Sequence, residues 1–187
     1  MPIRIRHART FIGLILVAAM AATRFHHLGD ALHLPDASWA LFFLAGVYLS
    51  PAWLLVLMAE ATLIDGAAIG WLGVSSYCLT PAYAGLLLAY LLLWSGGRQA
   101  AGAGLGGAAG AALSSTLLAF LVSNGSFYWG GGRVAEPTLA GFVQTCLDYG
   151  PSFIVATLLY LGLAAIIHGV LAAPGRGRRV LGSSTGR

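Results

Sequence analysis

Residues 52–71 read AWLLVLMAEATLIDGAAIGW, and Glu60 and Asp65 are the only charged side chains in this run. About 20 consecutive apolar residues are needed to cross the hydrocarbon core of a bilayer, so the run predicts a membrane-spanning helix. The whole chain agrees with this prediction. Of its 187 residues, 58% are apolar and 9% are charged, against about 25% charged in an ordinary soluble domain. Together with a mean hydropathy of +0.83, this composition excludes a soluble globular domain and a disordered chain.

Five further apolar runs predict helices over about 10–24, 37–50, 82–95, 100–123 and 139–172. Six spans of about 20 residues leave no room for a separate soluble catalytic or ATP-binding domain. We therefore expect an all-α membrane protein with one transmembrane domain over 1–187 and short tails at 1–9 and 174–187. The runs 37–50 and 82–95 are short for a bilayer. Pro151 is expected to kink the long last run or to begin its true span.

The arginines predict the orientation. All ten basic residues are arginines, and they cluster near the two ends of the chain. With six spans and both termini in the cytoplasm, only Arg24 and Arg133 fall outside, as the excess of positive charge in cytoplasmic loops requires. The outer connections are then 24–36, 72–81 and 124–138. This pattern is typical of membrane flanks, and we expect no nucleic-acid partner.

The N-terminal run has a second interpretation. A basic start, an apolar run and the small residues at 19–21 are also typical of a cleaved signal peptide. The arginine balance favours keeping this segment as the first span.

Small residues recur at intervals of four in two places. Residues 102–107, GAGLGG, match a dinucleotide-binding pattern by spelling, but the strand that this pattern requires is not predicted. Gly102, Gly106 and Gly110 in the same stretch are four residues apart. We expect these glycines to pack between helices instead. Ala18 and Ala22 have the same spacing, which suits packing within the chain or docking of a partner helix.

Polar side chains are expected to converge at the outer ends of the helices. Asp65 lies roughly 9 Å below the outer end of its helix, at a rise of about 1.5 Å per residue. Cys78 follows in the next connection, Tyr83 begins the following helix, and His26 follows the first helix. All four are predicted to line one pocket that opens outward. The Cys78 thiol is an apolar filler, half of a disulfide with Cys146, or a soft metal ligand.

Two other functions remain open from the residues alone. One is a divalent-cation transporter whose metal ligands would form a stripe, with one ligand at every third residue. The alternative interpretation of this stripe is a solvated outer loop. The stripe consists of His27, Asp30, His33 and Asp36. The other is a membrane enzyme with Asp65 and His26 as an acid–base pair. The phosphate-loop, nucleophile-elbow and zinc-helix motifs are missing from the sequence.

Three stretches carry a resemblance to a known family. They are RFHHLGDALHLPDASW at 24–39, LIDG at 63–66 and GVSSYCLTPAY at 73–83. Together they resemble the BtuM family, small bacterial vitamin B12 uptake proteins related to the substrate-binding S-components of energy-coupling-factor (ECF) transporters. The resemblance is strongest over 24–90 and weak after about 125. It implies a six-helix S-component bundle in the bacterial cytoplasmic (inner) membrane, with a substrate cavity facing outward.

The resemblance also implies a substrate and a site. The substrate would be cobalamin or a related corrinoid, and Cys78 would be the axial ligand of its cobalt. His26, Asp65, Tyr77 and Tyr83 would be polar residues near the bound corrinoid, and exchange at cobalt would displace cyanide from cyanocobalamin.

The resemblance implies a partner as well. The face of Ala18 and Ala22 resembles the motif by which S-components dock to the coupling subunit. A vitamin transporter for another substrate, such as riboflavin or biotin, is the alternative with the same fold.

Overall fold

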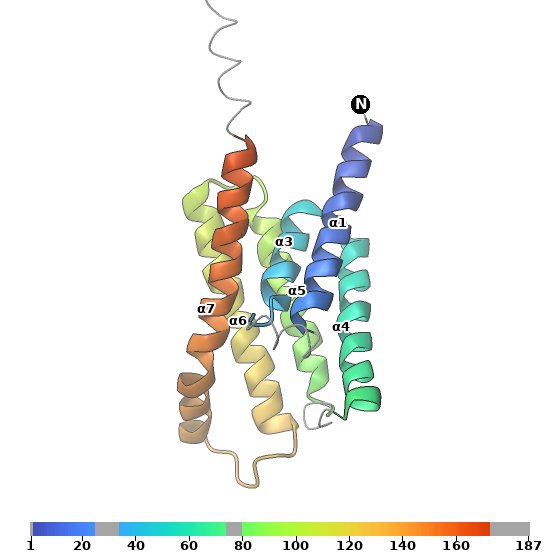
Figure 1. The fold of residues 1–187 in the computed structure, drawn as a ribbon. Helices are drawn as coiled ribbons and strands as arrows, with labels where there is room; N and C mark the ends of the chain where they lie inside the picture. The colour runs from blue at the N-terminus through green and yellow to red at the C-terminus, as the bar shows by residue number, and fades with distance from the viewer. Residues whose placement is uncertain (1, 25–33, 74–79, 173–187) are drawn as a thin grey trace, which may run out of the picture.

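The structure is a computed structural model that describes residues 2–24, 34–73 and 80–172. These residues form six helices and no strand, which confirms the all-helical prediction (Figure 1). The helices are α1 (Pro2–Arg24), α3 (Ser38–Tyr48), α4 (Pro51–Leu72), α5 (Tyr83–Ala100), α6 (Leu105–Gly130) and α7 (Leu139–Ala172). Most boundaries lie within a few residues of those predicted. The largest difference is at α1, which begins at Pro2 rather than near residue 10.

Successive helices run in opposite directions along the bundle. The start of α1, the end of α7, and the α3–α4 and α5–α6 connections all lie at one end of the bundle, at the top of Figure 1. The α6–α7 connection lies at the opposite end. The described ends of the chain are therefore on the same side, which is the arrangement expected for an even number of crossings.

Among the described residues, three segments are long and apolar enough to cross a membrane. They are Pro51–Trp71, Leu105–Gly130 and Leu139–Leu171. The 11 residues of α3 extend for only about 16 Å at 1.5 Å per residue, roughly half the hydrocarbon thickness. The structure thus has the composition and lengths of a helical membrane protein, and α3 is as short as its sequence predicted.

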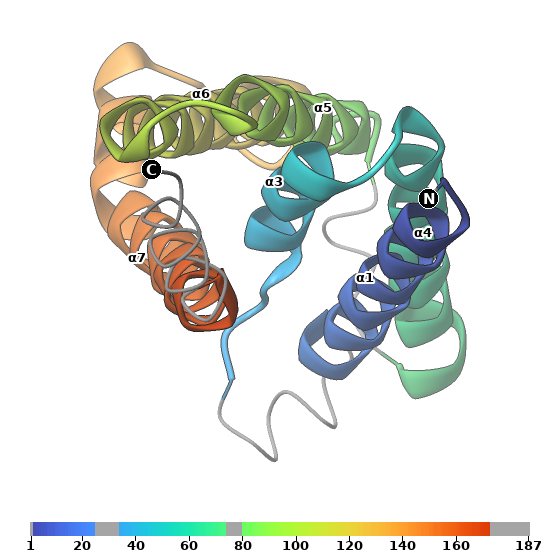
Figure 2. The ribbon, with the colours of Figure 1, turned by 90° about the horizontal axis from the view of Figure 1, so that it is seen from above.

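Helix α3 occupies the middle of the bundle. Seen from above, α5 and α6 lie along one side of it, α1 and α4 along another, and α7 along a third (Figure 2). Phe42 of α3 is fully buried and belongs to one core with Met20 of α1, Leu57 of α4 and Leu93 of α5. A helix enclosed in this way needs apolar side chains around its whole circumference, and the sequence SWALFFLAGVY supplies them.

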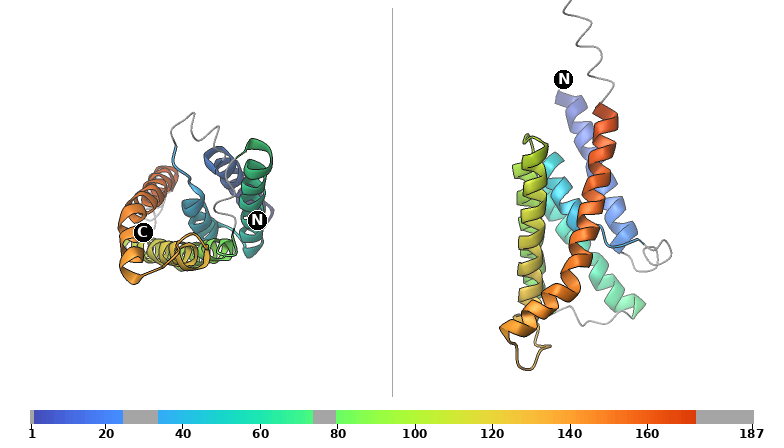
Figure 3. Two further views of the ribbon diagram at one scale, coloured as in Figure 1. Left: turned by 90° about the horizontal axis from the view of Figure 1, so that it is seen from below. Right: turned by 90° about the vertical axis from the view of Figure 1, so that its left-hand side faces the viewer.

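The outer helices expose apolar side chains. Leu63 of α4 is 71% exposed, and Ile166 of α7 is 65% exposed. Apolar surface of this extent is unusual for a soluble monomer and suits contact with lipid. Figure 3 shows that α7 is bent. Pro151 lies inside this helix, so the helix continues through the proline instead of starting at it.

Local signals explain the limits of α4. Pro51 occupies the first position of the helix, where its missing N–H leaves no hydrogen bond unmade. Gly73 ends the helix with φ of +68°, a left-handed conformation that glycine adopts without a steric penalty. These two residues place Asp65 two turns before the end of α4.

The expected packing of Gly102, Gly106 and Gly110 within the chain is wrong. A Cβ added to any of the three would meet no atom within 4 Å, and Gly102 lies before α6 begins. The backbones of α3 and α5 instead approach closely at Gly46 and Gly97, where an added Cβ would collide with a carbonyl of the facing helix. The spacing of four identified a common face, but the packing of α3 on α5 decided which glycines are used.

Candidate functional site

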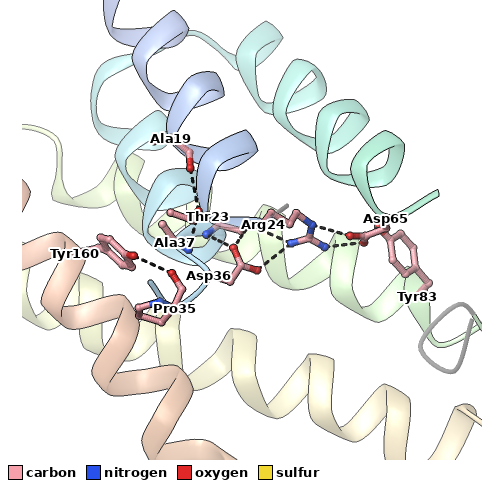
Figure 4. A network of polar contacts seen from close by, with 10 residues as sticks. Ala19, Thr23, Arg24, Pro35, Asp36, Ala37, Asp65, Tyr83 and Tyr160 are labelled. Atoms are coloured by element: carbon pink, nitrogen blue, oxygen red, sulfur yellow. Dashed lines mark hydrogen bonds and ion pairs between the residues drawn. The ribbon is translucent and has the colours of Figure 1, made fainter. Parts of the chain in front are cut away.

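The most highly connected polar side chain in the described structure is that of Arg24, the last residue of α1. Its Nε donates to Oδ1 of Asp65 at 2.8 Å, and its Nη2 donates to Oδ2 of the same carboxylate at 2.7 Å (Figure 4). Two parallel bonds of this kind fix both the distance and the plane of the two groups. The Arg24 side chain is only 10% exposed, and that of Asp65 is 25% exposed, so the pair is largely screened from solvent.

The second carboxylate that pairs with Arg24 belongs to Asp36, which lies just before α3. Nη1 of Arg24 donates to Oδ2 of Asp36 at 3.2 Å and to the hydroxyl of Ser38 at 3.0 Å. The other oxygen of Asp36 accepts from the backbone N–H of Ser38 at 2.8 Å and from the Ser38 hydroxyl. Asp36 therefore ties the start of α3 to the end of α1.

Three further hydrogen bonds hold the segment that leads into α3. The hydroxyl of Thr23 accepts from the backbone N–H of Ala37 at 3.2 Å and donates to the carbonyl of Ala19 at 2.9 Å. Tyr160 of α7 donates its hydroxyl to the carbonyl of Pro35 at 2.8 Å. Residues 35–37 are consequently anchored to α1 on one side and to α7 on the other (Figure 4).

Two tyrosines of α5 border the cluster. Tyr83, the first residue of α5, donates its hydroxyl to Oδ2 of Asp65 at 2.8 Å. Tyr90 follows two turns later, and its ring centroid lies 5.9 Å from the guanidinium carbon of Arg24. Tyr90 is fully buried and stacks on Phe42 with centroids 4.0 Å apart. The polar cluster thus lies against a packed aromatic layer.

The structure brings together two of the predicted site residues, Asp65 and Tyr83. His26, Tyr77 and Cys78 lie outside the described residues, so their part in a site stays a prediction. In the sequence, His26 follows Arg24 by two residues and Cys78 precedes Tyr83 by five. The two stretches that carry these residues therefore adjoin the cluster along the chain.

The second cysteine, Cys146 of α7, is a free thiol. The amide nitrogen of Asn124 of α6 donates to its sulfur at 3.3 Å. This disagrees with the alternative of a disulfide between Cys146 and Cys78.

The divalent-cation stripe is described only at Asp36, which pairs with Arg24. Its other members, His27, Asp30 and His33, lie outside the described residues. Within the ranges 2–24, 34–73 and 80–172, no group of three or more histidine, cysteine, aspartate and glutamate side chains is placed to hold a metal ion.

The central role of Arg24 was not predicted from the sequence, in which this residue counted only as a charge in an outer connection. A usable signal was present, because a charged residue at the end of an apolar helix needs a partner of opposite charge. Four acidic residues follow Arg24 before α5, and sequence order alone does not choose Asp36 and Asp65 over Asp30 and Glu60. A second long-range polar contact lies outside this cluster, where the Tyr48 hydroxyl is 3.2 Å from Nδ1 of His168.

The cluster can hold a polar ligand through hydrogen bonds. Arg24, Asp36 and Asp65 together have a formal charge of −1, and the carboxylate of Asp65 is held in one orientation from two directions. No protein-family model matches the chain, and no curated protein matches it. The fold and the cluster define a class of protein: an all-helical bundle, with helices long and apolar enough to cross a membrane, in which a partly buried ionic cluster joins the ends of α1, α3 and α4.

Proposed function

We propose that this protein binds a corrinoid, vitamin B12 or a close relative, and carries it across the bacterial cytoplasmic membrane. In this proposal the six helices are six spans, both termini are cytoplasmic, and the site faces outward. The proposal rests on the resemblance of 24–39, 63–66 and 73–83 to the BtuM family. The alternating helix directions and the shared side of the two described ends support this topology.

The observation that carries the proposal is the contact between Asp65 and Tyr83. These residues come from α4 and α5, and the stretch between the two helices contains Cys78. The hydrogen bond of 2.8 Å between them therefore joins the two sides of the connection that holds the proposed cobalt ligand. His26 belongs to the connection that begins directly after Arg24. The connection with His26 and the connection with Cys78 therefore both adjoin the same cluster along the chain.

The chemistry at cobalt is ligand exchange. The Cys78 thiolate donates an electron pair to Co(III) and the cyanide of cyanocobalamin leaves as an anion, so the oxidation state of cobalt does not change. Thiolates are soft donors that suit such a metal centre. In this scheme His26, Asp65, Tyr77 and Tyr83 position the corrinoid or tune the exchange. The Ala18 and Ala22 face of α1 is the proposed contact for a coupling subunit.

The test compares one cysteine variant with a matched control. Wild type, Cys78→Ala and Cys146→Ser are purified in detergent, incubated with cyanocobalamin and freed of unbound vitamin before absorbance spectra are taken. We expect wild type and Cys146→Ser to retain corrin with shifted bands, and Cys78→Ala to lose the shift. The control is suitable because Cys146 of α7 is also a free thiol, and the described structure places it against Asn124 of α6.

Two results would count against the proposal. A Cys78→Ala protein with full affinity and an unchanged spectrum would refute the proposed thiolate–cobalt bond. Wild-type protein that retains no corrin would overturn corrinoid binding altogether and favour another vitamin or a cation as the substrate.

A further inference from the structure

The described residues leave the Asp65 carboxylate with one open acceptor position. Oδ1 accepts from Nε of Arg24, and Oδ2 accepts from Nη2 of Arg24 and from the Tyr83 hydroxyl. An ionised carboxylate has about four acceptor positions. The described residues occupy three of them, and the position left over is on Oδ1.

Arg24 determines where that position points. The two parallel hydrogen bonds from its guanidinium to Asp65, here called the fork, set the plane of the carboxylate. The guanidinium itself is held by Asp36, Ser38 and the face of the Tyr90 ring. Since these partners come from the start of α3 and from α5, Arg24 is restrained from two directions. With 10% exposure, its side chain has little freedom to reorient into solvent.

We propose that Arg24 is a positioning residue of the corrinoid site. It holds Asp65 so that the acceptor position on Oδ1, which the described residues leave open, receives a hydrogen-bond donor of the ligand. The inference rests on the proposed function. The peripheral carboxamide groups of a corrinoid are donors of the required kind. Arg24 does not touch the ligand in this arrangement; it acts through Asp65 and leaves the Tyr83 hydroxyl directed at Oδ2.

The fork distinguishes arginine from lysine. A lysine at position 24 keeps the positive charge but presents a compact ammonium, which cannot make two parallel bonds to one carboxylate. The contact with Asp36 is a weaker restraint, because it is a single bond of 3.2 Å to a side chain that is 45% exposed. Removing the charge of Asp36 should therefore leave the fork on Asp65 in place.

The experiment measures the dissociation constant for cyanocobalamin and the absorbance spectrum of the bound corrin. The variants are Arg24→Lys, Arg24→Gln, Asp65→Asn and the double variant Arg24→Gln/Asp65→Asn. The matched control is Asp148→Asn, at an exposed carboxylate of α7 outside the cluster. Circular dichroism and thermal unfolding report whether each variant is folded.

We expect Arg24→Lys to weaken binding by about tenfold or more, the scale of one charge-assisted hydrogen bond, while the shifted corrin bands remain. Asp148→Asn should change the dissociation constant by less than about threefold, since its printed hydrogen bond is to Gln144 of the same helix and exposed charges contribute little. The double variant should bind no more weakly than Asp65→Asn alone, because Arg24 acts through Asp65. A purely structural role would lower the unfolding temperature without this non-additivity in binding.

Two results would overturn the positioning role and leave the proposed function standing. One is wild-type affinity in a folded Arg24→Lys protein. The other is an equal loss of affinity from Arg24→Gln whether or not Asp65 has been replaced. Wild-type protein that retains no corrin would overturn the proposed function and, with it, this inference.

Discussion

Replacing Gly46 with alanine tests the arrangement of the bundle at its centre. A Cβ at Gly46 would collide with the backbone carbonyl of Trp94 and would lie 3.0 Å from the Cα of Gly97. Backbone atoms cannot rotate aside as a flexible side chain can, so α3 and α5 must move apart. Because α3 also packs on α1, α4 and α7, that movement loosens several contacts at once.

The size of the effect follows from two opposing terms. Overpacking a well-packed core costs about 1–3 kcal/mol, and alanine is favoured over glycine inside a helix by about 1 kcal/mol. Because the obstacle is backbone, we expect the upper part of the first range and a net loss of about 2 kcal/mol. For a chain of this length, such a loss corresponds to a decrease in Tm of roughly 4–8 °C.

The assay is thermal unfolding of the detergent-purified protein, followed by circular dichroism. Gly110→Ala is the matched control, because a Cβ at Gly110 meets nothing within 4 Å and alanine there should leave stability unchanged or raise it by up to about 1 kcal/mol. A Gly46→Ala protein as stable as wild type, or equal changes at both positions, would refute the close approach of α3 and α5.

Three other predictions concern the polar contacts, and thermal unfolding measures each of them. Asp65→Ala removes the partner of both fork bonds of Arg24 and should cost about 3 kcal/mol, whereas Asp36→Ala should cost less than about 1 kcal/mol because its side chain is 45% exposed; equal losses would contradict this ranking. Tyr83→Phe removes one hydrogen bond to Asp65 and should cost about 1 kcal/mol, so a variant as stable as wild type would mean that this bond contributes nothing. Tyr160→Phe removes the bond to the carbonyl of Pro35 and should lower the free energy of unfolding by about 1 kcal/mol. A decrease above roughly 1.5 kcal/mol would exceed what one neutral hydrogen bond supplies.

The helices could be predicted well because their signals are local. The run 52–71 corresponds to α4 (Pro51–Leu72), and its limits depend on a proline and a glycine within the same segment. The start of α1 was placed too late because the arginines before residue 10 lower the local hydropathy, although they do not prevent helix formation. Charged side chains disfavour insertion into a membrane, whereas they do not prevent the backbone hydrogen bonds of a helix.

The candidate site could be predicted only in part. The alternation of helix directions was enough to place Asp65 beside Tyr83, because both lie near the ends of consecutive helices. It was not enough to show that Arg24 reaches across to α4, since this depends on how closely α1 packs against that helix. The same limit applies to Tyr48 and His168, which are 120 residues apart in the chain.

Composition and hydropathy by themselves determined that this protein is a bundle of apolar helices, because each helix satisfies its own backbone and its length follows from its own residues. The tertiary structure decided the central position of α3, the close backbone approach of α3 and α5 at Gly46 and Gly97, and the sharing of Arg24 between two carboxylates. Each of these depends on which helix faces meet. An apolar face can pack against any other apolar face of suitable shape, so the pattern along one helix does not specify its neighbour.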